Sequence, residues 1–239
     1  MKTTFYALLA GLLATIPALG RDFRPLRLQQ APDSSTTLRP GEQSRGRIVL
    51  VHGFLENGNT FRMLRKRLEK QGFECLVARM KPSDGRSGLE ELAVGLKREI
   101  DDTFGTGQPI SIVAFSMGGL VSRHYLQNLG GAARCKSLFT ISSPHQGTWA
   151  AWAYPGKGAA QMRPGSGFLA SLSESEGRLG DMPVVSYRTP MDLIILPPTN
   201  SVWQRAENLE FRVPLHPLML NSGPVLDDIE RRLIDHHQD

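Results

Sequence analysis

Ser116 stands where an apolar run meets an amphipathic segment, a position in which a serine can act as a nucleophile. The run Ile110–Phe115 reads ISIVAF, and Met117 with two glycines follows the serine. A strand that passes directly into a helix holds the serine in a strained turn, which pushes its hydroxyl out of the sheet edge. This turn needs small residues two positions before and after the serine, here Ala114 and Gly118. The pattern A-x-S-x-G relaxes the usual G-x-S-x-G, and the alternative is an ordinary strand–helix junction.

We expect His216 to be the general base for this serine. His124 lies on the same predicted helix as Ser116, about 12 Å along its axis at 1.5 Å per residue, which excludes it. His216, in the stretch PLHPLML, follows the last predicted strand and precedes the last predicted helix. A loop at that point lies at the carboxyl edge of the sheet, from which an imidazole can reach the serine.

The other histidines have different expected positions. His52 precedes a glycine at the end of an early strand, where we expect it to hold its loop by hydrogen bonds and to line the pocket. His145 follows the strand beside the serine strand, and we expect it to line the pocket together with Trp149. His236 and His237 are expected in an exposed terminal tail.

Asp192 is the expected acid of a Ser-His-Asp triad. It lies in TPMDLIILPP, after the predicted strand 182–187 and at the same sheet edge as the serine, whereas Asp181 precedes that strand. The chain order Ser116, Asp192, His216 is the order that one hydrolase fold uses and that two other triad folds do not. The alternative is that Asp192 is an ordinary polar residue of a loop.

The elements that must position these residues alternate between strand and helix. Strands are predicted at 47–51, 73–78, 110–115, 137–142, 182–187 and 209–213. Helical periodicity follows each of the first three strands and the last one, and Ser87 with Glu90 three residues later predicts a capping box at one helix start. Alternation of this kind predicts a mostly parallel sheet of about six strands with helices on both faces. We therefore expect one α/β domain over 47–239 with a lid-like insertion at 148–180.

The chain resembles the α/β-hydrolase superfamily, and within it the small bacterial triacylglycerol lipases and esterases. The stretches that carry the resemblance are HGF, AFSMGG, SSPHQGT, MDLIILP and LHPLML. The resemblance implies an α/β-hydrolase fold, with Ser116 as nucleophile and Asp192 and His216 as acid and base. It also implies an oxyanion hole made by the backbone N–H groups of Phe54 and Met117.

The same resemblance bears on cofactors and on the two cysteines. The chain departs from the lipase pattern because it has no recognisable pair of calcium-binding aspartates around the triad. We therefore expect no metal, and the resemblance implies no organic cofactor. The family's sheet order places two strands between those of Cys75 and Cys135. Three spacings of about 4.8 Å then separate them by roughly 14 Å, beyond the limit of about 7 Å for a disulfide. Two free, mostly buried thiols are therefore expected.

The activity implied is hydrolysis of carboxylic esters, with lipid or long-chain acyl esters as the preferred substrates. Two alternatives remain open. One is a thioesterase or acyltransferase on the same scaffold, and the other is a non-catalytic binding protein that keeps the hydrolase fold. The insertion 148–180 carries aromatic and apolar side chains, which suit either a lid that opens on a lipid surface or a cover that closes the core.

Composition and the N-terminal stretch restrict partners and location. The 239 residues carry 28 basic and 23 acidic side chains, a net charge of +5, and no nucleic-acid motif, so no nucleic-acid partner is expected. Residues 1–20 read as a signal peptide, with an uncleaved membrane anchor through 3–20 as the alternative. A Pro- and Ser-containing arm at 21–46 follows. We expect the folded part outside the cytoplasm, secreted or periplasmic, where it would meet a small-molecule or lipid ester and a membrane or lipid surface.

Overall fold

The computed structural model describes residues 44–237. The expected signal segment, 1–20, and the expected arm, 21–46, lie outside the described residues apart from 44–46. Within 44–237 no helix combines the length and the apolar run needed to cross a bilayer.

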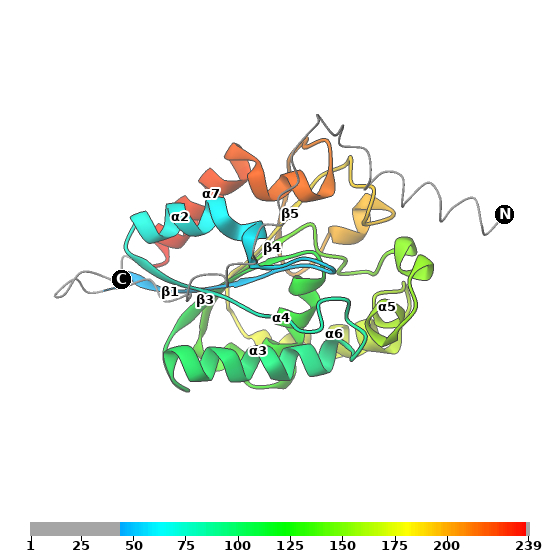
Figure 1. Cartoon of the computed structure of the whole chain (residues 1–239), viewed down its shortest axis with the longest axis horizontal. Coiled ribbons are helices and arrows are strands. Elements are labelled where there is room, and N and C mark those ends of the chain that lie inside the picture. Colours follow the sequence, from blue (N-terminus) through cyan, green and yellow to red (C-terminus); the bar gives the residue numbers. More distant parts are fainter. Residues whose placement is uncertain (1–43, 238–239) are drawn as a thin grey trace, which may run out of the picture. The chain divides into compact units, whose positions relative to one another are not determined.

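A parallel sheet forms the centre of the described part, as the sequence predicts. Its six strands are β1 (Gly46–Val51), β2 (Phe73–Val77), β3 (Ile110–Phe115), β4 (Cys135–Ile141), β5 (Val184–Arg188) and β6 (Glu207–Glu210). They lie in the order β2-β1-β3-β4-β5-β6, and each pairs in parallel with its neighbours (Figure 1). Consecutive parallel strands need a crossover connection, which the intervening helices and loops supply.

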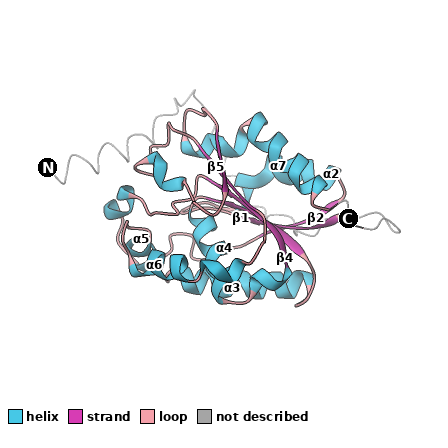
Figure 2. Ribbon diagram, turned by 180° about the vertical axis from the view of Figure 1, so that it is seen from behind, coloured by secondary structure: helices cyan, strands magenta, loops and turns pink. Residues whose placement is uncertain are grey.

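Helices cover both faces of this sheet (Figure 1, Figure 2). The face with α2 (Arg62–Lys70) and α7 (Gly223–Asp235) is opposite the face with α3 (Leu89–Phe104), α4 (Met117–Asn128) and α6 (Gly167–Glu174). The shorter helices are α5 (Lys157–Gln161) and the 3-10 turns η1 (Gly58–Phe61), η2 (Gly131–Arg134), η3 (Trp149–Ala153), η4 (Glu176–Leu179), η5 (Pro198–Ser201) and η6 (His216–Asn221).

Because both faces are covered, the central strands are apolar on both sides. In β3, Ile112 and Ala114 belong to the core beneath α3 and α4, whereas Val113 and Phe115 belong to the core beneath α2 and α7. Every residue of β3 is buried.

The strand order also determines where a site can form. From β1 the chain first adds β2 on one side, then crosses to β3 and continues outward on the other side. The direction of winding therefore reverses between β1 and β3. In open α/β sheets a crevice forms at the carboxyl ends of the strands at this reversal. The residues directly after β1 and β3 are His52 and Ser116.

The insertion 148–180 is helical and has two parts that differ in burial. Its second part closes the core, because Phe168, Leu169 and Leu172 of α6 are buried there. In its first part the indole side chains of Trp149 and Trp152 are 60% and 58% exposed. The second part therefore acts as a cover for the core, whereas the first presents apolar surface.

Two local predictions were wrong. The start of α3 has Gly88, with φ 101°, at its N-cap and no capping side chain. Glu90, expected in a capping box, instead accepts a hydrogen bond from the Gln161 side chain at 2.5 Å. The expected exposed tail is partly buried, since His237 lies against Phe73 and its Nε2 is 3.0 Å from Ser111 Oγ.

The prediction for the cysteines is confirmed. Cys75 lies on β2 and Cys135 on β4, with β1 and β3 between them, and both thiols are free and buried. Burial raises the pKa of each thiol to about 12, which leaves both thiols protonated at neutral pH.

Candidate active site

Ser116 lies at the sharp turn that joins β3 to α4. Its backbone has φ 53° and ψ −124°, a conformation that non-glycine residues adopt at a cost of about 1–3 kcal/mol. Its N–H donates to the carbonyl of Ile141 at 2.8 Å, which fixes the turn to the neighbouring strand β4. The side chain does not cap the helix, so the hydroxyl is left for other partners.

Close packing around this turn explains the small residues on either side of the serine. A Cβ atom on Gly118 would lie 2.3 Å from the carbonyl oxygen of Val51 and 2.7 Å from that of His52. Only glycine therefore allows α4 to begin so close to the end of β1. Ala114, fully buried in β3 opposite Val51, is small enough for its position.

Asp192 and His216 form a buried hydrogen-bonded pair at the same sheet edge. Asp192 lies in the loop after β5, and His216 is the first residue of η6, after β6. The distance from His216 Nδ1 to Asp192 Oδ2 is 2.7 Å, with the residues 6% and 2% exposed. The other carboxylate oxygen accepts the N–H groups of Ile194 and Ile195, both at 2.9 Å. Both oxygens of the carboxylate thus accept hydrogen bonds. Because the imidazole must donate to Asp192, its proton lies on Nδ1, which leaves Nε2 as the acceptor.

The imidazole of His216 lies beside the serine strand. Its ring centroid is 4.7 Å from that of Phe115, the residue before Ser116. Within residues 44–237 no hydrogen bond joins the Ser116 hydroxyl to this ring. In hydrolases without substrate such a bond is often long and shortens when substrate binds.

The loop after β1 supplies a backbone N–H group beside the serine. Gly53 packs so closely that a Cβ atom on it would be 3.0 Å from Ser116 Cβ. The N–H of Phe54, the next residue, donates no hydrogen bond to any residue of the described part. Met117, as the first residue of α4, also has no acceptor one turn earlier in its helix. Among residues 44–237, neither of these two backbone N–H groups therefore has a hydrogen-bond acceptor.

Two polar side chains near this site were not predicted. Glu56 accepts a hydrogen bond from the N–H of Gly53 at 3.0 Å; burial raises the pKa of its carboxyl, partly offset by that bond and by His216. Thr189, fully buried after β5, donates to the carbonyl of Val213 at 2.6 Å and accepts from the N–H groups of Met191 and Val213. Neither residue belongs to a motif, and each gains its role only when separate segments meet.

The three residues expected to line the pocket differ in their surroundings. His52 is buried, and its Nδ1 donates to the carbonyl of Gly53 at 3.0 Å. The His145 ring lies 3.0 Å from Thr140 Oγ1 at one nitrogen and 3.4 Å from an Arg123 nitrogen at the other. Burial and the neighbouring guanidinium lower the pKa of His145 well below its ordinary value, so this ring is neutral and occupied. Trp149 lies largely in solvent.

Exposed apolar side chains gather in the segments after β1, β5 and β6, which carry Phe54, Asp192 and His216, and in η3. Among residues 44–237 ten large apolar side chains are exposed, of which only Met63 and Val94 lie elsewhere, on α2 and α3. We call the other eight the apolar rim: Leu55, Trp149, Trp152, Met191, Leu193, Ile194, Leu215 and Leu218. A hydrogen bond connects two of these segments, since Thr148 Oγ1 donates to the carbonyl of Ile194 at 2.7 Å.

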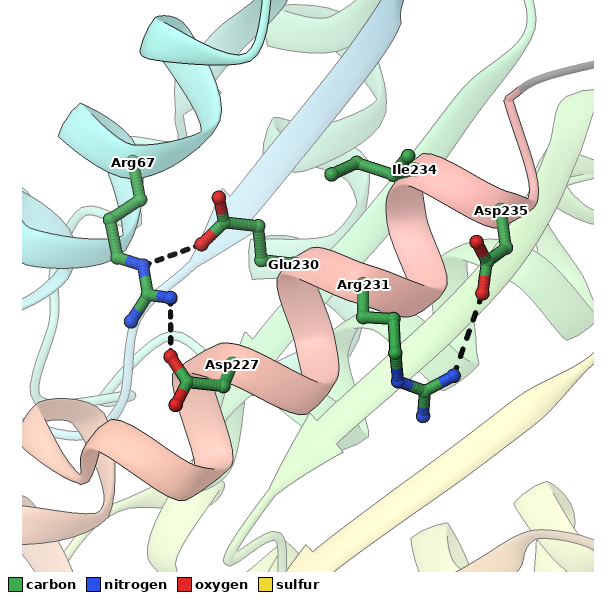
Figure 3. Close-up of a pocket in the computed structure, with 6 residues that line it drawn as sticks. All are labelled: Arg67, Asp227, Glu230, Arg231, Ile234 and Asp235. Carbon is green, nitrogen blue, oxygen red and sulfur yellow. Dashed lines mark hydrogen bonds and ion pairs between the residues drawn. The ribbon is translucent and has the colours of Figure 1, made fainter.

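A surface cavity between α2 and α7 is a separate feature (Figure 3). It has a volume of about 300 Å³ and contains none of the residues described above. Arg67 binds Asp227 at 2.5 Å and Glu230 at 2.6 Å, and Arg231 lies 3.5 Å from Asp235. Its charges pair with one another, and this pairing connects α2 to α7. Among residues 44–237 no group of His, Cys, Asp or Glu side chains is arranged to hold a metal ion.

Comparisons with known proteins agree with this fold. Residues 43–155 match the protein family described as "Putative serine esterase (DUF676)". The lipase BlEst2 of Bacillus licheniformis is 14% identical with a TM-score of 0.64, over 83% of this chain and 96% of that one. A monoacylglycerol lipase of Paleococcus ferrophilus is 16% identical with a TM-score of 0.59, over 82% and 96%. A thermophilic esterase of Thermogutta terrifontis is 14% identical with a TM-score of 0.56, over 82% and 92%. No curated protein sequence matches the chain significantly.

Proposed function

We propose that this chain, which has the α/β-hydrolase fold and is similar to serine esterases, hydrolyses carboxylic esters through an acyl-enzyme on Ser116. The observation that carries the proposal is the buried Asp192–His216 pair at the sheet edge where Ser116 sits in its strained turn. A buried carboxylate bonded to an imidazole beside a strained serine is the arrangement that activates a hydroxyl for acyl transfer.

In the proposed cycle His216 Nε2 takes the hydroxyl proton as Ser116 Oγ attacks the ester carbonyl. Asp192 keeps the ring in the required tautomer and stabilises the imidazolium that forms. The N–H groups of Phe54 and Met117 bind the developing oxyanion, a contribution of about 3 kcal/mol for each donor. His216 then gives its proton to the leaving alcohol, and a water molecule attacks the acyl-enzyme with the same imidazole as base.

We further propose lipid or long-chain acyl esters as the substrates, taken up at a lipid surface. The apolar rim supports this part of the proposal, because exposed apolar area concentrated around one site is typical of contact with an apolar partner. Each side chain that leaves water fully gains about 1.5–3 kcal/mol. The phenyl ring of Phe54 also packs edge-on against Tyr154 of the insertion, with centroids 5.1 Å apart, so the insertion borders the oxyanion loop.

The proposal is tested by turnover of p-nitrophenyl esters of increasing chain length. Ser116→Ala and His216→Ala should each reduce kcat by at least about 10,000-fold while the chain stays folded, because triad members act as one unit. His124→Ala, on the same helix as the serine, is the matched control and should keep its turnover. Full activity in Ser116→Ala would contradict the proposal, and thioester turnover far above ester turnover would favour the thioesterase alternative.

A further inference from the structure

The peptide that carries the Phe54 N–H is fixed by hydrogen bonds on both sides of Gly53. On one side the N–H of Gly53 donates to Glu56 Oε2 at 3.0 Å. On the other side the carbonyl of Gly53 accepts from His52 Nδ1, also at 3.0 Å. Gly53 has no side chain to limit its rotation, so these two bonds restrict its backbone in place of a Cβ atom.

Because the peptide bond is planar, the restraint on the Gly53 carbonyl also restrains the proposed oxyanion donor, the N–H of Phe54. The carbonyl of Gly53 and the N–H of Phe54 belong to one peptide unit, and in a trans peptide they point in opposite directions. When His52 holds the carbonyl, the direction of the Phe54 N–H is set. Glu56 holds the preceding peptide unit, so the remaining freedom at Gly53 is also reduced.

The loop bends back so that Glu56 can reach Gly53. Leu55, between the donor residue and Glu56, has φ 58°, a left-handed conformation that is strained for a branched apolar side chain. Its N–H donates to the carbonyl of Ser83 at 2.9 Å, which ties the bend to a second segment. Strain of this kind persists where the surrounding structure maintains it, and such residues gather at functional sites.

Glu56 also lies next to the proposed reacting groups. A Cβ atom on Gly53 would be 3.0 Å from both Glu56 Oε2 and Ser116 Cβ, so the carboxyl and the serine side chain both pack closely against Gly53. Burial raises the pKa of this carboxyl, and His216 acts against that larger effect by lowering it. Either protonation state of Glu56 has an oxygen that can accept the Gly53 N–H.

We propose that Glu56 is a positioning residue of the oxyanion loop, which acts through Gly53 to direct the Phe54 N–H at the ester oxygen. This inference rests on the proposed ester hydrolysis. It assigns Glu56 no contact with substrate. The hydrogen bond, rather than the negative charge, carries the effect.

Three substitutions of Glu56 test the proposal by steady-state kinetics on one soluble p-nitrophenyl ester. Glu56→Gln keeps an acceptor oxygen and should retain kcat within about threefold. Glu56→Met and Glu56→Ala remove the acceptor, the first with the side-chain volume kept. Each should lower kcat by about 10- to 100-fold, less than the roughly 100- to 1,000-fold cost of losing a whole oxyanion donor. KM should stay within about twofold, since an oxyanion donor acts in the transition state.

The controls separate this inference from the function on which it rests. Glu91→Ala, an exposed acid on α3, should match the wild type. If the wild type is active and Glu56→Met keeps its kcat, only the role of Glu56 is contradicted. Equal losses in Glu56→Gln and Glu56→Met would also contradict it, because charge or packing would then be responsible. A wild-type chain without ester turnover would contradict the proposed function, and the inference with it.

Discussion

The three hydrogen bonds that Asp192 accepts show how one side chain can set the tautomer of another. Two come from backbone N–H groups of its own loop and one from His216 Nδ1. The backbone bonds turn one oxygen away from the imidazole and aim the other at it. The carboxylate therefore presents only an acceptor to His216, which keeps the Nδ1 proton in place.

Asp192→Asn should leave the loop intact and still abolish most of the activity. An amide can turn its NH₂ toward the imidazole, which stabilises the tautomer with the proton on the wrong nitrogen. The same change in a serine protease triad lowers kcat by about 10,000-fold, and we expect a loss of that order in ester turnover. Asp181→Asn, an exposed acid before β5, is the control. A loss below about tenfold would show that Asp192 does not orient the base.

Residue type and position relative to a strand end were sufficient to predict that Ser116, Asp192 and His216 lie at one sheet edge, because parallel strands bring their carboxyl ends together. Glu56 and Thr189 could not be selected in this way. The role of Glu56 depends on the left-handed turn at Leu55, which an ordinary leucine in a sequence does not indicate. The role of Thr189 depends on its hydrogen bond to the carbonyl of Val213, more than twenty residues away.

At the scale of elements, one hydroxyl joins the two loops that carry the acid and the base. Thr189 Oγ1 bonds Met191 N in the Asp192 loop and both backbone groups of Val213 in the His216 loop. The loops follow different strands, β5 and β6, so their separation depends on such a connection.

Thr189→Val removes this connection with little change in shape. The buried carbonyl of Val213 and the N–H of Met191 lose a partner, whereas the N–H of Val213 keeps the carbonyl of Phe211. The unsatisfied groups should lower the free energy of unfolding by roughly 1–3 kcal/mol. We also expect kcat to fall by about 10- to 100-fold, because small displacements of catalytic groups are costly. Denaturation in urea and steady-state kinetics measure the two effects, and Thr103→Val on the exposed end of α3 is the control. Destabilisation with unchanged kcat would contradict a role in positioning.

The apolar rim is also a property of elements, because it arises from loops rather than from one motif. The double variant Trp149→Ser, Leu193→Ser should lose activity on an emulsified long-chain ester by about tenfold or more. A loss of about 1.4 kcal/mol of apolar burial is sufficient for that factor. Activity on a soluble short-chain ester should be unchanged. Met63→Ser with Val94→Ser, exposed but on α2 and α3, is the matched control. Equal losses on both substrates would contradict the surface-binding role of the rim.

At the scale of the whole molecule, His237, which follows α7, packs against the first residues of three neighbouring strands, β1, β2 and β3. A Cβ atom on Gly46 would be 2.3 Å from the His237 ring, which also meets Phe73 and Ser111. Burial, together with Lys136, His236 and Arg45, lowers the pKa of His237 from 6.5 to about 4. The folded chain therefore keeps this ring neutral at a pH where the unfolded chain protonates it.

Stability should consequently decrease as pH falls from about 6.5 to about 4. In that window the unfolded state binds more protons than the folded state, so protonation favours unfolding. Above pH 6.5 both states are neutral at this residue and its contribution is fully present. His237→Gln, which keeps polar atoms near Ser111, should weaken the dependence when urea unfolding is followed at pH 7.5, 5.5 and 4.5. An unchanged pH dependence would show that His237 does not contribute.

The architecture was predictable from the sequence because apolar runs alternate with helical segments from β1 to β4, a pattern typical of a parallel sheet. The last strand, β6, reads ENLE and is mostly exposed, and its bounds differ from the predicted 209–213. The packing of His237 could not be predicted, since a short polar segment after the last helix gives no sequence signal of burial. The helices of the insertion were missed for a related reason. They are short, and their glycines and prolines interrupt the periodicity by which a helix is recognised.

The central claim, that Ser116 is the nucleophile of an acyl-transfer site, is tested most directly by a fluorophosphonate. The reagent reacts preferentially with a serine whose hydroxyl is activated, and the adduct can be located by mass spectrometry of peptides. We expect one adduct, on the peptide that contains Ser116, which Ser116→Ala abolishes and Asp192→Asn slows. An adduct on a different serine, or none on the folded wild-type chain, would contradict the account.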